Sequence, residues 1–278
     1  MTRVVVTSDL HLGITDERAL RAHAAAITAE APDLTVLAGD IAEGYTCFEQ
    51  CLSIFGEAPG EVAVLAGNHD VWAREYHTSQ DLWARLLPNA TRNAHMLWLE
   101  DATWMRNNLA VVGSIAWYDY SAAAPSLGRD AIFWEANKGR WNADARFVNW
   151  SWSDPEFATL VGDRLVERVA TLETDPAVTA ILVVTHVPLF EEQMLRRPDD
   201  LNWTYGNTYF GNFTLGERLL FAQKLRGVIS GHTHVQRYGF HARAGEPLPV
   251  WVIGSDYRSP GYVVFDYPEP DAAGGAVR

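Results

Sequence analysis

The stretch EVAVLAGNHD, from Glu61 to Asp70, is an apolar run that ends in Gly67, Asn68, His69 and a final aspartate. A buried strand can stop in any turn, and one glycine is enough to make such a turn. Three successive side chains that can bind a metal ion or transfer a proton are more than a turn requires. The same pattern at other strand ends would therefore indicate a shared site.

Four other apolar runs also end in side chains of this kind. Together with the first stretch they hold five of the nine histidines of the chain. Ligands of open α/β sheets bind beyond the carboxyl ends of the strands, so we expect these clusters to meet although they are far apart in sequence. Any one of them alone is also explained by an ordinary polar turn. The side chains are Asp9 and His11 after VVVTS, Asp40 after LTVLAG, His186 after ILVVT, and His232 and His234 after GVISG.

Apolar strands alternate with helical patterns through much of the chain. Continuous Val, Ile and Leu runs are typical of strands covered on both faces, and their alternation with helices indicates βαβ crossovers. Thr15 is expected to cap the first helix. The expected helices are residues 15–31, 45–56, 79–88, 154–173 and 215–225.

The strands after residue 226 have fewer helices between them, which indicates a mixed second sheet packed against the first. Here we expect PVWVIGS, residues 249–255, to pair with GYVVFDYP, residues 261–268. The predicted fold is α/β, a layered sandwich in a single domain over residues 1–268. Residues 269–278 are expected to form a flexible tail.

Composition limits the classes of partner. The chain has 278 residues and a formal net charge of −13, which argues against nucleic acid as a partner but allows an anionic substrate on bound divalent ions. No apolar run approaches the roughly 20 residues of a membrane span. The N-terminal residues lack the features of a secretory signal, so we expect a cytoplasmic protein. Cys47 and Cys51 are interpreted as small buried residues.

The candidate ligands are carboxylates, an amide oxygen and imidazoles, without thiolates. Such a set suits Mn, Fe, Zn, Co or Ni. Seven candidates suit two ions that share a carboxylate better than one tetrahedral ion. Because residues i and i+2 of an extended chain point to the same side, the pair Asp9 and His11 and the pair His232 and His234 can each reach one site.

The order D-x-H, G-D, G-N-H-D, H and G-H-x-H resembles the calcineurin-like metallophosphoesterase superfamily, from residue 4 to about residue 265. The resemblance implies two β-sheets between helices, an α/β/β/α arrangement. It also implies the ligands of two ions, which are Asp9, His11 and His234 for the first, Asn68, His186 and His232 for the second, and Asp40 as the bridge.

Two further roles follow from the resemblance. His69 resembles the family's histidine that does not bind metal and instead protonates the leaving oxygen or stabilises charge on the phosphoryl group. Asp70 is expected to orient His69 and raise its basicity. Glu43, three residues after the bridging carboxylate, is interpreted as a solvated loop acid.

The predicted function is hydrolysis of a small phosphate ester by a metal-bridged hydroxide. The GNHD block and the chain length resemble bacterial phosphodiesterases that act on nucleotide-like or glycerophosphodiester substrates. A phosphomonoesterase with the same mechanism is the main alternative. A non-catalytic metal-binding scaffold is a remote alternative, because no ligand is missing. A dinuclear amide hydrolase fits poorly, because its H-x-H-x-D-H cluster does not occur in the sequence.

Two aromatic-rich insertions, residues 115–152 and 190–215, are expected to form a cap. One interpretation is a lid that stacks on a nucleobase or another flat group, with an arginine on phosphate. The alternative is an aromatic subcore or a homodimer contact, since Trp and Tyr also dominate interfaces. The sequence is compatible with both interpretations.

Overall fold

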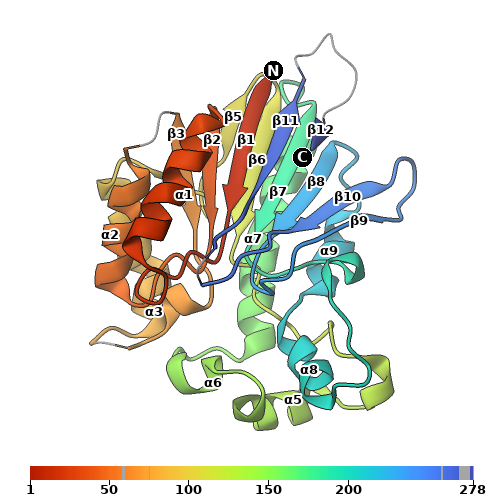
Figure 1. The fold of residues 1–278 in the computed structure, drawn as a ribbon. Helices are drawn as coiled ribbons and strands as arrows, with labels where there is room; N and C mark the ends of the chain where they lie inside the picture. Colours follow the sequence, from red (N-terminus) through yellow and green to blue (C-terminus); the bar gives the residue numbers. More distant parts are fainter. Residues whose placement is uncertain (58–59, 75, 258, 269–275, 278) are drawn as a thin grey trace.

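The computed structural model describes residues 1–57, 60–74, 76–257, 259–268 and 276–277, and in this part of the chain two six-stranded sheets form the centre of the molecule (Figure 1). The first sheet has the order β12-β11-β1-β2-β3-β4, and the second β5-β6-β7-β8-β10-β9. The strands of the first sheet are β1 (Thr2–Thr7), β2 (Leu34–Ala38), β3 (Glu61–Leu65), β4 (Leu97–Trp98), β11 (Tyr262–Tyr267) and β12 (Ala276–Val277). The strands of the second are β5 (Trp104–Arg106), β6 (Leu109–Ser114), β7 (Ala180–Thr185), β8 (Leu225–Ser230), β9 (Arg237–His241) and β10 (Leu248–Val252).

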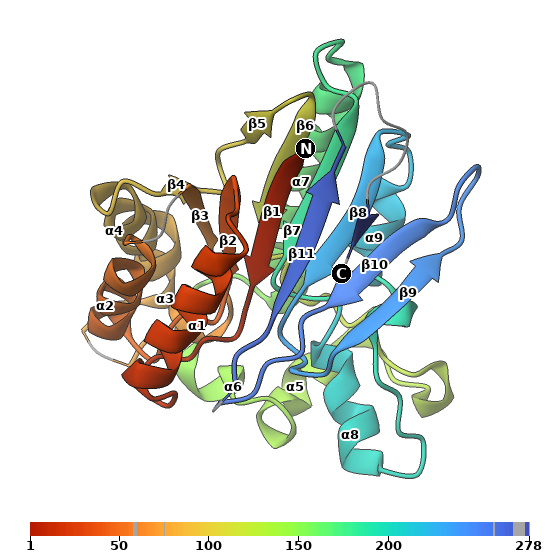
Figure 2. The same cartoon turned by 45° about the horizontal axis from the view of Figure 1, so that its top comes forward.

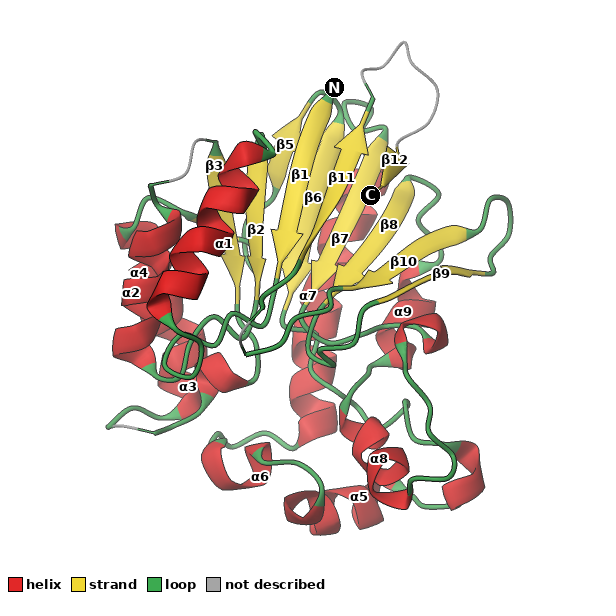
Figure 3. Ribbon diagram, viewed as in Figure 1, coloured by secondary structure: helices red, strands yellow, loops and turns green. Residues whose placement is uncertain are grey.

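Helices cover the outer face of each sheet, which confirms the four-layer α/β/β/α sandwich (Figure 3). Helices α1 and α2 pack on the first sheet, and α7 and α9 pack on the second. The α-helices are α1 (Glu17–Ala29), α2 (Tyr45–Phe55), α3 (Ser79–Asp81), α4 (Leu87–Asn93), α5 (Ala131–Asn137), α6 (Asp144–Phe147), α7 (Asp154–Thr174), α8 (Leu201–Gly206) and α9 (Phe213–Leu219). In the described ranges, every helix falls short of the length or the apolar character that a bilayer span requires.

The strands are buried on both faces, as their continuous apolar runs predict. In β1, Val4 and Val6 belong to the core between the two sheets, whereas Val5 belongs to the core under the helices. All three side chains are fully buried. This alternation explains why the strand carries no polar position in its middle.

Both sheets are mixed. Strands β1 to β4 run parallel and β11 is antiparallel to β1; β6, β7, β8 and β10 run parallel, with antiparallel β5 and β9 at the edges. The predicted pairing of residues 249–255 with 261–268 is wrong. Strand β10 pairs with β8, whereas β11 crosses to the first sheet and sets Phe265 opposite Val4.

The first helix is capped one residue later than predicted. The Asp16 side chain, not that of Thr15, accepts hydrogen bonds from the backbone N–H groups of Arg18 (2.7 Å) and Ala19 (3.4 Å). A carboxylate at this position also interacts favourably with the helix dipole.

The two insertions contribute α5, α6 and α8, which lie beyond the carboxyl ends of the parallel strands (Figures 1 and 2). Many of their aromatic side chains form a subcore: Trp117, Tyr118, Trp134 and Tyr209 are fully buried or nearly so. Asp154, at the start of α7, accepts hydrogen bonds from Trp117 Nε1 and Lys138 Nζ, both at 2.7 Å. The subcore interpretation is therefore confirmed for these side chains.

The predicted domain limits and the two insertion ranges stay predictions. Residues 269–275 and 278 of the expected tail lie outside the described residues. Residues 276–277 are described and pair with β11 as the short strand β12.

Candidate dinuclear metal site

The side chains that follow β1, β2, β3, β7 and β8 meet at one end of the two sheets. All seven predicted ligands are in this group. Among the described residues, ligand atoms within 4.8 Å of one another define three sets: one is His11, Glu43 and His69, and the other two, called the first and second sets, share Asp40. The first set is Asp9, His11, Asp40 and His234, and the second is Asp40, His186 and His232.

In the first set, His234 Nε2 lies 3.3 Å from His11 Nε2 and 3.3 Å from Asp9 Oδ1. His11 Nε2 is also 3.6 Å from Asp40 Oδ2. Asp9 and His11 are fully buried, whereas the side chain of His234 is 26% exposed. One side of this set is therefore open to a substrate.

Asn68 joins the second set: its Oδ1 lies 3.0 Å from His186 Nε2 and 3.0 Å from His232 Nδ1. The other carboxylate oxygen of Asp40, Oδ1, is 3.4 Å from His186 Nε2. Each oxygen of Asp40 thus faces a different set, as a bridging carboxylate requires.

Hydrogen bonds orient three of the imidazoles. His186 Nδ1 donates to Ala38 O (3.0 Å), and His232 Nε2 donates to the backbone oxygen of Tyr209 (3.1 Å). His11 Nδ1 is 3.0 Å from Glu43 Oε1 and donates to it. The second nitrogen of each ring points into the cluster, which is the arrangement of metal-binding histidines.

The donor atoms face one another closely enough to need a positive charge between them. His186 Nε2 and His232 Nδ1 are 3.2 Å apart. In the metal-free protein a proton supplies the charge: burial works against it, but Asp40 outweighs burial and raises the pKa of His186 to about 9. Burial and the charge on His186 lower the pKa of His232 to about 4. The residues therefore fit two cations by geometry, donor chemistry and charge.

The backbone of the ligand loops is in an unusual conformation. Five of the seven residues have positive φ, between 46° and 71°. Such values are uncommon for residues other than glycine and gather at functional sites. The expectation that an extended chain brings i and i+2 to one site is thus wrong in its geometry. His232 lies in the second set and His234 in the first. The five residues are Asp9, His11, Asp40, His232 and His234.

His69 lies beside the cluster, on the pocket. Its Nε2 is 3.9 Å from Asp40 Oδ2, and its backbone N–H donates to Asp40 Oδ1 at 2.8 Å. Its Nδ1 donates to Glu43 Oε1 at 2.6 Å. Burial opposes charge on the ring, but Asp40 and Glu43 outweigh it and raise the pKa of His69 to about 9. In the metal-free protein this imidazole is protonated at neutral pH.

Glu43 is a buried part of the site, so its interpretation as a solvated loop acid is wrong. Its side chain is 5% exposed and accepts from both His11 and His69 through Oε1. Arg74 Nη2 lies 2.5 Å from Oε2. Burial disfavours the carboxylate, but hydrogen bonds from the two histidines outweigh burial and lower its pKa to about 2.

Asp70 does not orient His69, which corrects the predicted contact. Its Oδ1 accepts from the N–H groups of Ile41 (2.9 Å) and Ala42 (3.1 Å), and its Oδ2 accepts from Gly67 (2.8 Å). Asp70 therefore ties the loop after β3 to the loop after β2. Burial and nearby Asp40 raise the pKa of Asp70 to about 7.

The cap supplies a residue of the site that the sequence analysis missed. Asp144 is fully buried, and its Oδ1 accepts from Asn68 Nδ2 (2.9 Å) and Trp72 Nε1 (2.6 Å). Its Oδ2 accepts from the hydroxyl of Tyr118 (2.8 Å). The Trp72 ring in turn stacks on His69, with centroids 3.7 Å apart. Asp144 is thus linked to a predicted ligand and to the predicted proton donor.

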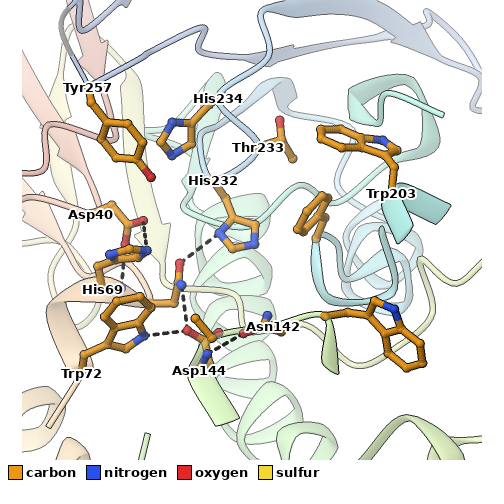
Figure 4. A pocket seen from close by; sticks show the side chains of 14 residues that line it. Asp40, His69, Trp72, Asn142, Asp144, Trp203, His232, Thr233, His234 and Tyr257 are labelled. Carbon is orange, nitrogen blue, oxygen red and sulfur yellow. Dashed lines mark hydrogen bonds and ion pairs between the residues drawn. The ribbon is translucent and has the colours of Figure 1, made fainter. Parts of the chain in front are cut away.

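A pocket of about 270 Å³ opens at the cluster (Figure 4). Asp40, His69 and His232 line one side of it, and cap residues line the other. Tyr257, which the sequence analysis also missed, packs its ring 5.0 Å from His11 and 5.3 Å from His234. Tyr257 comes five residues after the end of β10, and a tyrosine after a strand does not by itself indicate a site.

The family profile for calcineurin-like phosphoesterases matches residues 2–236. The chain belongs to this family. It is accordingly a dinuclear-metal phosphoesterase, a hydrolase, and the two ligand sets are its candidate metal sites. The resemblance to this family and the predicted enzyme class are both confirmed.

Solved structures share the fold at low sequence identity. Phosphopantetheinyl hydrolase (PptH) from Mycobacterium tuberculosis is 18% identical with a TM-score of 0.69, covering 99% of each chain. A dimetal phosphatase from Danio rerio is 14% identical with a TM-score of 0.59, over 95% of this chain and 92% of the other. The protein TT1561 of Thermus thermophilus is 12% identical with a TM-score of 0.58, over 100% and 98%. The search of curated proteins found no match.

Proposed function

We propose that this phosphoesterase hydrolyses a small phosphodiester, with a phosphomonoesterase as the second candidate. The observation that carries the proposal is the pocket, whose lining includes His69 together with members of both ligand sets, Asp40, His232 and His234. Its described lining contains no Lys or Arg. A diester carries one negative charge, whereas a monoester dianion has a second charge that cationic side chains would otherwise balance.

The proposed ligands are the seven residues predicted from the sequence. Asp9, His11 and His234 hold one ion, Asn68, His186 and His232 the other, and Asp40 both. When bound, the two ions supply an acidified water as nucleophile and positive charge for the phosphoryl oxygens. Carboxylate, amide and imidazole donors suit Mn, Fe, Zn, Co or Ni.

His69 is the proposed proton donor. Its Nε2 lies toward the pocket and its Nδ1 is held by Glu43, so the ring can release a proton from Nε2 to the leaving oxygen. Glu43 stabilises the charged ring and fixes its orientation. Trp72, stacked on the ring, prevents it from turning away from the pocket.

Hydrolysis by carefully remetallated protein tests the proposal. The substrates are bis-p-nitrophenyl phosphate, p-nitrophenyl phosphate, a glycerophosphodiester, linear and cyclic nucleotides, and a phosphopantetheinyl ester, the group in the name of the M. tuberculosis hydrolase. We expect a higher kcat/KM for diesters than for monoesters. The opposite ratio favours the monoesterase, and two bound ions without any hydrolysis favour the metal-binding scaffold.

Two other expectations about the protein's setting stay predictions. Cytoplasmic location is checked by fractionation, and the homodimer by light scattering across a range of concentrations.

A further inference from the structure

We propose that three cap residues, Trp141, Trp203 and Phe210, form a subsite for a flat, uncharged ring on the substrate. This group is called the aromatic wall below. The inference rests on the proposed phosphodiesterase function and names its substrate class: diesters in which the ester group that stays on phosphorus is an aryl group or a nucleoside.

The aromatic wall and the ligand sets belong to the same pocket. Trp203 lies across the pocket from Asp40 and His69, with His232 between them (Figure 4). The ring of Phe210 contacts the ring of His232 edge to face, with centroids 5.6 Å apart. The wall therefore begins directly beside the second ligand set. A phosphoryl group on the ligand sets would place its ester group against the wall.

Neighbouring side chains and a backbone oxygen hold the two indoles in place. The ring of Tyr205 stacks on Trp141 at 4.4 Å and an interplanar angle of 18°. Trp203 Nε1 donates to Leu195 O at 2.7 Å, and the guanidinium of Arg197 lies 4.2 Å from the centre of its ring. Both indoles are only partly buried. Rings held rigid before binding lose little conformational entropy when a ligand stacks on them.

The charges of the pocket select against a substrate with several phosphates. Its described lining has no Lys or Arg, and Arg197, whose guanidinium lies over the ring of Trp203, is not part of that lining. Asp144 is fully buried and already accepts hydrogen bonds from three donors, so it is poorly placed to pair with a cationic group. The group that fits this pocket best is therefore a neutral flat ring. Such a ring stacks on aromatic side chains whatever hydrogen-bonding groups it carries at its edge.

The test compares two diesters with the same charge and leaving group, thymidine 5′-p-nitrophenyl phosphate and methyl p-nitrophenyl phosphate. We expect the wild-type protein to have at least a tenfold higher kcat/KM for the thymidine ester. Trp141→Ala and Trp203→Ala should reduce this preference at least fivefold, mainly through KM, and leave the methyl ester within about twofold. Trp141→Phe and Trp203→Phe, which keep a flat ring, should retain most of the preference.

Leu201→Ala is the matched control, because Leu201 lies in the same helix as Trp203, is 67% exposed and does not line the pocket. Where an alanine variant does not fold, the leucine variants replace it, since they fill space without a flat face. Equal loss for both esters, or an unchanged preference, overturns the aromatic wall and leaves the phosphodiesterase intact. Failure of the wild-type protein to cleave either ester overturns the proposed function, and the subsite with it.

Discussion

Asn68 Nδ2 donates a hydrogen bond of 2.9 Å to Asp144 Oδ1, and this bond joins a residue after strand β3 to the cap. Because the amide nitrogen is bound on this side, the amide oxygen faces His186 and His232. The cap thus does more than cover the pocket: it determines which atom of Asn68 the second ligand set receives.

The first prediction follows from this bond. Asp144→Ala should weaken binding of the second ion by about 10- to 100-fold, because Asn68 can then rotate its amide. Asp144→Asn keeps an acceptor and should restore much of the affinity. Isothermal titration with Mn²⁺ or Zn²⁺ measures both. Asp154→Asn is the control, since this buried carboxylate at the start of α7 bonds to cap side chains and to no proposed ligand. Two ions bound by the alanine variant with wild-type affinity would contradict the role.

Glu43→Gln should lower kcat by about 10- to 100-fold, because one carboxylate positions both His11 and His69. Its loss also removes a charge that raises the pKa of His69. The donor then loses its proton at lower pH, so the alkaline limb of the kcat profile should move toward lower pH. If the variant has the same kcat and the same alkaline limb as the wild-type protein, Glu43 is not a positioning residue.

His69→Ala should impair poor leaving groups most. A proton donor contributes about 10²- to 10⁴-fold when the leaving oxygen is basic and much less when it is a nitrophenolate. The measurement is kcat for an alkyl diester and for bis-p-nitrophenyl phosphate at the same metal content. Equal losses, or none, on the two substrates would remove His69 as the acid.

Gly39→Ala should destabilise the protein and disturb the site. Gly39 has φ +85°, and a Cβ there would lie 2.6 Å from His186 Nδ1, which is the atom that donates to Ala38 O. Gly245→Ala is the matched control, since it has φ +90° and no neighbour within 4 Å. The control should lose about 1 kcal/mol of unfolding free energy from backbone strain alone, and Gly39→Ala clearly more. Similar losses would show that the close approach to His186 is unimportant.

His23 should make stability depend on pH below neutrality. It is buried against Thr7 Oγ1 (2.9 Å), and burial lowers its pKa to about 4 from 6.5. Between these values the unfolded chain holds a proton that the folded protein lacks, so stability falls as the pH falls from 6.5 to 4. Near pH 5 this contribution is about 2 kcal/mol. Chemical denaturation of metal-free protein at pH 7 and pH 5 measures it, and His23→Gln should flatten the dependence. If the variant loses as much stability as the wild-type protein between pH 7 and pH 5, other groups cause the pH dependence.

The sequence by itself determined the layers and the positions of the candidate ligands. A strand covered on both faces is predicted at Val4, Val5 and Val6, because burial on both faces selects an apolar residue at every position. The candidate ligands come together because parallel strands that start together also end together. Asp9 and His232 are 223 residues apart, yet both follow strands that end at the same end of the two sheets.

Only the tertiary structure decided how side chains outside these strand ends are shared. Glu43, and not Asp70, reaches the His69 ring, and Asp144 comes from a distant insertion to hold Asn68. The partner of β11 is likewise decided by contacts with the first sheet rather than by its neighbour in sequence. Local sequence patterns record which residues are buried. They do not record how loops with left-handed backbone turn, or which of several nearby carboxylates a given donor meets.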